Sequence, residues 1–166
     1  QHSVVKIQNG NPSGLAASNV MVTGSGAVAR FLATDASGSV FTSFSSERGP
    51  VLLSQTYVLS ATNLSLSHFL TEPVVTGAAR GATTDAKGIL YIVEPIQQEL
   101  ILISTASERT VERYVIPSVT GISLLGLAAQ DVAVAPDGTV YVVVNDSQNT
   151  TIDGPGAVIK FRKVTQ

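Results

Sequence analysis

Short segments in which apolar and polar residues alternate run along the chain, separated by turn-forming residues. Alternation combined with β-branched and aromatic side chains is typical of strands in a pleated, partly buried sheet. The clearest alternating segments are residues 39–44, 89–93 and 139–144. Further strands are expected at residues 51–54, 99–104, 110–116 and 157–163. The pattern predicts an all-β protein.

The same pattern returns at an interval of fifty residues. Segments 30–41, 80–91 and 130–141 each run from a short strand through a turn with Asp and Gly into the next strand. Glycine adopts the positive φ that such turns require, and Asp caps them by bonding to nearby backbone N–H groups. The residues expected in these structural roles are Gly38, Gly88, Gly138, Asp35, Asp85 and Asp137. The period predicts a repeating four-stranded antiparallel meander.

The turn motif resembles the NHL-type repeat of six-bladed β-propellers in the gluconolactonase-like superfamily. The best match is Asp-Val-Ala-Val-Ala-Pro-Asp-Gly-Thr-Val-Tyr-Val-Val-Val at residues 131–144, and the first copy matches more loosely. The resemblance spans about residues 20–163. It implies three four-stranded antiparallel blades, either half of a six-bladed ring or an open array. A β-sandwich with accidental internal similarity is the alternative.

One domain is expected over residues 1–166, with repeats at approximately 20–70, 71–118 and 119–166. Residues 1–19 would form an N-terminal strand and linker. Residues 3–8 resemble residues 157–162, the third strand of the last repeat, which has no fourth strand after it. We therefore expect Val4, Val5 and Ile7 to belong to an assembly strand that completes a blade in the same chain or in a partner; residues 19–23 are a second candidate.

Three blades cannot close a ring of the usual four to eight blades, so a blade face is expected to remain exposed. Composition agrees with this, because 44% of the residues are hydrophobic, only 13% are charged and the mean hydropathy is +0.30. We expect a homo-oligomer, either a two-fold dimer that closes a six-bladed ring or a filament. The other possibility is that the chain is half of a longer propeller.

Several classes of protein are excluded by composition. The chain has 166 residues, enough for a core, and no cysteine for disulfides or thiolate metal sites. A net charge of −2 with scattered Lys and Arg argues against nucleic-acid binding, and no apolar run is long enough for a membrane span. The sequence begins with Gln1 instead of Met, so we expect either a processed mature form or a fragment, and a processed form indicates a secreted or cell-surface protein. The candidate glycosylation sites are Asn63, Asn145 and Asn149.

Catalytic chemistry has few candidate residues. The two histidines are His2 and His68, no Gly-x-Ser-x-Gly motif is present, and no catalytic residue is predicted. Calcium is the only metal considered, because it binds oxygen ligands. Candidate ligands at predicted strand ends are Glu94, Asp131, Asn145 and Asp146. Gluconolactonase-like propellers hold a central divalent ion with a carboxylate, an Asn and an Asp, but their motif cannot be matched here residue by residue.

Arg30 and Arg80 share one position in the repeat, which Gln130 occupies in the third copy. Paired guanidinium groups suit recognition of carboxylates or sugars. The interpretation we favour is structural, with the arginines paired to Glu47 or Glu72 of a neighbouring blade.

The leading functional hypothesis is a secreted or cell-surface, non-catalytic interaction module that self-associates through blade faces and strand pairing. One alternative is a calcium-assisted, lactonase-like hydrolase whose site forms only in the assembled ring. Another is a carbohydrate-binding propeller, which is less favoured because the chain has no Trp to stack on sugars. No cofactor other than calcium is expected.

Overall fold

The computed structural model describes residues 5–8, 11–15, 27–46, 55–60, 62–70, 79–119, 129–145 and 156–161. Every regular element in these ranges is a β-strand, and all strand pairs are antiparallel. The described residues include no helix with the length and hydrophobicity needed to cross a bilayer. The all-β, blade-like architecture predicted from the repeat is confirmed.

The first four-stranded sheet, blade 1, contains β3 (Ala27–Thr34), β4 (Val40–Ser46), β5 (Gln55–Leu59) and β6 (Leu66–Phe69) in that order. The third strand expected at residues 51–54 falls outside the described residues, and β5 begins at Gln55. The described part of the third strand in blade 1 thus lies just after the segment expected from the sequence.

Blade 2 also has four strands, β7 (Ala82–Thr84), β8 (Ile89–Glu94), β9 (Glu99–Ser104) and β10 (Thr110–Val115). Blade 3 contains β11 (Ala129–Val134), β12 (Val140–Asn145) and β13 (Gly156–Phe161). Its sheet has three strands among the described residues, one fewer than blades 1 and 2. Its outer strand β13 therefore has no described neighbour on one edge.

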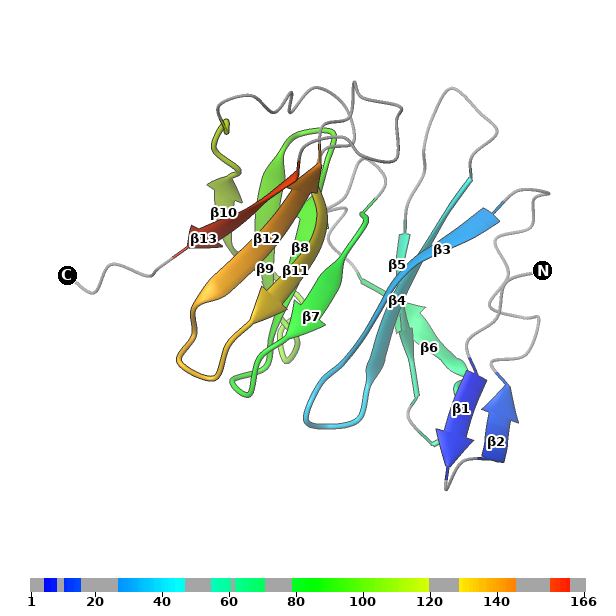
Figure 1. Cartoon of the computed structure of the whole chain (residues 1–166). Helices are drawn as coiled ribbons and strands as arrows, with labels where there is room; N and C mark the ends of the chain where they lie inside the picture. Colours follow the sequence, from blue (N-terminus) through cyan, green and yellow to red (C-terminus); the bar gives the residue numbers. More distant parts are fainter. Residues whose placement is uncertain are drawn as a thin grey trace.

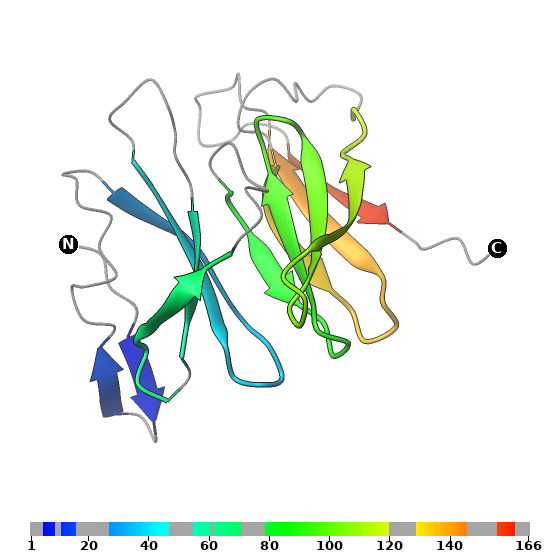
Figure 2. The same ribbon diagram turned by 180° about the vertical axis from the view of Figure 1, so that it is seen from behind.

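The three blades stand side by side with their first strands next to one another, as Figures 1 and 2 show. Strand β7 lies between β3 and β11 and contacts both of them. In each blade the strands follow one another outward from this inner strand in chain order. This radial arrangement of antiparallel meanders is that of a β-propeller.

Two apolar clusters hold the blades together. The cluster between blades 1 and 2 includes Phe31, Phe41, Val58, Leu90, Ile92 and Ile101. The cluster between blades 2 and 3 includes Val93, Leu100, Ile116, Val132, Val142 and Val144. Burial of each large aliphatic or aromatic side chain contributes about 1.5–3 kcal/mol, which makes these interfaces the main source of stability.

The N-terminal strand β1 (Val5–Gln8) pairs with β2 (Asn11–Leu15) in a separate two-stranded sheet. Figures 1 and 2 place this hairpin beyond blade 1, near the beginning of β6. Within the described part of this chain β1 is thus not the missing strand of a blade. Val5 and Ile7 of the candidate assembly strand lie in this hairpin, and Val4 is outside the described residues, as are residues 19–23.

Candidate functional site

The inner strands share a backbone irregularity at one position of the repeat. In β3 the pairing with β4 shifts between Ala29 and Phe31, and in β11 the pairing with β12 shifts between Ala129 and Asp131. Arg30 and Gln130 are therefore the extra residues of two β-bulges. At the corresponding place in blade 2, the Arg80 N–H donates to the Val93 carbonyl and the Val93 N–H donates to the Gly81 carbonyl.

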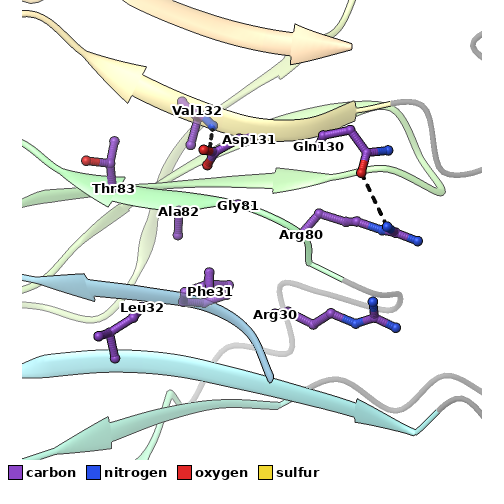
Figure 3. Close-up of a pocket in the computed structure, with 10 residues that line it drawn as sticks. All are labelled: Arg30, Phe31, Leu32, Arg80, Gly81, Ala82, Thr83, Gln130, Asp131 and Val132. Atoms are coloured by element: carbon purple, nitrogen blue, oxygen red, sulfur yellow. Dashed lines mark hydrogen bonds between the residues drawn. The ribbon is translucent and has the colours of Figure 1, made fainter. Parts of the chain in front are cut away.

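The side chains of Arg30, Arg80 and Gln130 lie in a row that runs across the three inner strands (Figure 3). Both guanidinium groups extend in the same direction. Arg80 donates a hydrogen bond from Nη1 to Oε1 of Gln130 at 3.3 Å. Glu47 and Glu72, the partners expected from the sequence, lie outside the described residues. The structure thus shows Arg80 bonded to its own repeat equivalent on the next blade.

The inner edges of blades 2 and 3 approach each other closely at Gly81. A Cβ atom at this position would lie 2.4 Å from both Cα and Oδ1 of Asp131. The Asp131 carboxylate is held in place there, because its Oδ1 accepts a hydrogen bond from the Val132 N–H at 2.8 Å. Only glycine fits this contact without a shift of the backbone.

A pocket of about 460 Å³ opens over this row of side chains. Its walls come from the inner strands of all three blades, at residues 30–32, 80–83 and 130–132. In Figure 3 the guanidinium groups lie at one end of the lining, and Leu32 and Ala82 lie toward the other. The pocket therefore has a cationic end and an end with apolar side chains.

The turn residues of the repeat have local structural roles. Gly38, Gly88 and Gly138 have φ values of 86°, 76° and 80°. Asp35 and Asp85 begin their turns, and each carboxylate accepts two backbone N–H bonds. Ala135 holds that position in blade 3, and Asp137 lies two residues after it.

Asp137 lies within the turn of blade 3 and accepts one bond, from the Thr139 N–H at 2.9 Å. Asp85 has an additional contact, because its second carboxylate oxygen accepts the Tyr91 hydroxyl at 3.0 Å. Burial, followed by this hydrogen bond, raises the pKa of Tyr91 to about 12. The Asp35 carboxylate likewise accepts the Ser37 hydroxyl, so Asp35 and Asp85 each accept three described bonds.

The calcium candidates occupy different environments. Glu94 is fully buried at the end of β8, where one carboxylate oxygen accepts the Gln97 N–H and Oε1 has no hydrogen-bond partner in the described structure. Burial raises the pKa of Glu94, while backbone bonds from Gln97 and Ile96 oppose that rise. Asp131 and Asn145 are exposed, and Asp146 lies outside the described residues. Among the described residues, no three His, Asp or Glu side chains are grouped as a metal site.

His68 connects two blades. It lies on β6 of blade 1, and its Nε2 is hydrogen-bonded to Oε1 of Glu108, which follows β9 in blade 2. Its Nδ1 is 2.9 Å from the Ser67 hydroxyl. These contacts place the histidine in an inter-blade link.

Of the candidate glycosylation sites, Asn63 is exposed in the turn between β5 and β6, where its Oδ1 accepts the Ser65 N–H at 3.0 Å. Asn145 is exposed at the end of β12. Asn149 lies outside the described residues.

Comparison with known proteins gives structural matches only. No protein-family model and no curated protein matches the sequence. A protein of unknown function from Bacteroides caccae aligns with a TM-score of 0.53 at 10% identity over 95% of this chain. Kuenenia stuttgartiensis hydrazine synthase aligns with a TM-score of 0.51 at 12% identity over 69% of this chain. This chain spans 53% and 28% of those two proteins, respectively.

These similarities support a β-propeller-like fold, since hydrazine synthase contains a fold of the propeller type. At such low identity they describe the fold alone. The pocket over the inner strands is the feature that sequence reasoning did not find. Its one visible signal was the recurrence of Arg30, Arg80 and Gln130 at the same position of the repeat.

Proposed function

We propose that the protein is a non-catalytic interaction module whose blade 3 binds blade 1 of a second copy, so that two chains close a ring. The observation that carries this proposal is the outward face of blade 3. Val143 and Val158 pair across β12 and β13 there, and they are 39% and 63% exposed. The alternate side chains of the same two strands, on the opposite face of the sheet, are packed against blade 2.

The outer edge of the same blade also supports association. Strand β13 has no described neighbour beyond it, whereas the third strands of blades 1 and 2 each pair with a fourth strand. An edge without a described neighbour, next to exposed valines, offers both backbone hydrogen bonds and apolar surface to another chain.

Blade 1 supplies a matching surface at the other end of the array. Leu32 on β3 is 56% exposed and Phe69 on β6 is 42% exposed. Leu32 alternates with Phe31 and Ala33, which pack toward blade 2, so it points to the opposite side. In a two-fold dimer, the outward face of blade 3 in each chain packs against the end face of blade 1 in the other chain. The two contacts are equivalent, and each one buries the exposed valines of one chain against Leu32 and Phe69 of the other.

Light scattering on the purified chain tests the proposal. We expect a particle of twice 17.2 kDa for the unmodified protein and a shift toward monomer for Val158→Asp, which places a charge in the contact. Val115→Asp is the matched control, because Val115 is 73% exposed on β10 and lies outside both end faces. A 17.2 kDa monomer at all concentrations contradicts self-association, and further blades from a longer polypeptide would then have to cover blade 3. A larger, open-ended series of particles indicates a filament instead of a ring.

The secreted or cell-surface location remains part of this proposal. Its support is the set of sequons, of which Asn63 and Asn145 are exposed. Intact mass of the protein from its native source tests it, since glycosylation adds mass that enzymatic deglycosylation removes.

A further inference from the structure

We propose that the N-terminal hairpin of one copy completes blade 3 of a second copy, with β1 adding to the outer edge of β13 as a fourth strand. This inference rests on the proposed dimer and names the segment that covers that edge. Blades 1 and 2 have four strands each, whereas blade 3 has three among the described residues. The outer edge of β13 therefore offers a row of backbone donors and acceptors to a further strand.

The position of the hairpin fits this role. The fourth strands of blades 1 and 2 are linked side by side, because His68 on β6 is hydrogen-bonded to Glu108, which lies just before β10. A blade on the other side of blade 1 would accordingly place its own fourth strand beside β6. Figures 1 and 2 show the hairpin on that side, beyond blade 1 and near the beginning of β6. In the proposed ring, the blade on that side is blade 3 of the second copy.

The hairpin and the edge that it would cover belong to opposite ends of one chain. Figures 1 and 2 place β1 and β2 at one end of the row of blades and β13 at the other, with blades 1 and 2 between them. A second copy is therefore needed to bring β1 next to β13. The two-fold symmetry of the dimer makes this exchange reciprocal, so each chain both donates a hairpin and accepts one.

Of the two strands in the hairpin, β1 is better suited to pair with β13. Strand β2 contains Pro12, which has no backbone N–H, and Gly14, which has no side chain to pack in a sheet. Strand β1 has an N–H at every residue and includes the β-branched residues Val5 and Ile7. We therefore place β1 against β13 and β2 at the new outer edge, where a proline is tolerated.

Both partners gain hydrogen bonds from this pairing. A two-stranded hairpin is only marginally stable by itself in water, and β1 and β2 form such a sheet in the single chain. Addition to blade 3 makes the hairpin part of a larger sheet in which β1 is paired on both edges. The lengths agree, since β1 has 4 residues and the fourth strands β6 and β10 have 4 and 6.

Backbone hydrogen exchange of the intact chain, measured above and below the concentration at which it dimerises, tests the proposal. We expect amides of β1 and β13 to exchange at least about tenfold more slowly in the dimer than in the monomer. Amides of β9 are the control, because this strand is paired on both edges within blade 2 and should exchange equally in both states. Exchange of β13 that is the same in monomer and dimer overturns the proposal.

Ile7→Pro separates strand addition from contact between blade faces. Proline removes a backbone donor from β1, so the dissociation constant of the dimer should rise about tenfold or more and the protection of β13 should be lost. Ile7→Val is the matched control, because valine keeps both the N–H and the β-branched shape and should change neither quantity. Unchanged exchange of β9 in Ile7→Pro shows that the blades remain folded, and the unmodified chain still decides the question if they do not.

The outcomes distinguish this inference from the dimer on which it rests. A dimer of Ile7→Pro that is as tight as the unmodified dimer, with β13 still protected, shows that strand addition is wrong while self-association stands. A chain that stays monomeric at all concentrations overturns both.

Discussion

Gly81 lies so close to Asp131 that an added Cβ atom would be 2.4 Å from the Asp131 Cα atom. The two residues are fifty positions apart in the sequence and belong to the inner edges of blades 2 and 3. Their contact limits how near these two inner edges stand to each other. The spacing of the blades is thus determined in part by the absence of one side chain.

Gly81→Ala should destabilise the protein by about 3 kcal/mol, because the new methyl group meets backbone that must shift. Gly138→Ala is the comparison, since a Cβ there meets nothing within 4 Å and only the φ of +80° opposes it. The cost at Gly138 should be about 1 kcal/mol. Denaturant unfolding measures both, and equal losses would show that the contact with Asp131 relaxes freely.

Asp85→Ala should destabilise the protein more than Tyr91→Phe. The Asp85 carboxylate accepts bonds from two backbone N–H groups and from the Tyr91 hydroxyl, and Tyr91→Phe removes the last of these bonds while it keeps the aromatic ring. At about 1 kcal/mol for each bond lost, we expect roughly 2–3 kcal/mol for Asp85→Ala and about 1 kcal/mol for Tyr91→Phe. Thermal and denaturant unfolding of the two variants test this order, and a larger loss for Tyr91→Phe would contradict it.

Glu94→Gln should stabilise the protein at neutral pH. Burial raises the pKa of Glu94 above its ordinary value of 4.5, so the unfolded state releases this proton at a lower pH than the folded state does. The stability associated with the protonated carboxyl is complete below pH 4.5 and is lost as pH rises through the folded-state value. Glutamine keeps an acceptor for the Gln97 N–H but carries no charge, so it avoids this loss.

The measurement is the free energy of unfolding of both proteins as a function of pH. The two curves should converge below pH 4.5 and separate above it, with the variant more stable. A gain for Glu94→Gln that is equal at all pH values would indicate packing as its cause instead of ionisation.

His68 and Glu108 should show a small energetic coupling between blades 1 and 2. Their side chains are 41% and 22% exposed, so solvent weakens the interaction, and we expect about 0.5 kcal/mol from a double-mutant cycle with His68→Ala and Glu108→Ala. Ser107→Ala is a suitable reference substitution in the same turn. Additive effects of the two alanine substitutions would show that this inter-blade contact contributes no stability.

Local features of the sequence were enough to identify the repeating unit. The turns around Gly38, Gly88 and Gly138 and the alternating strands that follow them are encoded within about a dozen residues each. Because strand alternation and turn chemistry act over such short distances, they predicted the all-β class and the blade-like meanders. The segment after β4 has no such signal, and the strand expected at residues 51–54 stays a prediction, because these residues lie outside the described ranges.

The candidate site depended on contacts between blades. Sequence position alone linked Arg30, Arg80 and Gln130, and the structure adds a hydrogen bond between Arg80 and Gln130 that the sequence did not indicate. The pairing of the arginines with Glu47 or Glu72 stays a prediction. The sequence also did not indicate that Glu94 is completely buried. The sequence by itself determined the unit that repeats, because that information is local. The tertiary structure decided which residues of successive units meet, because those contacts join positions about fifty residues apart and depend on how the blades pack.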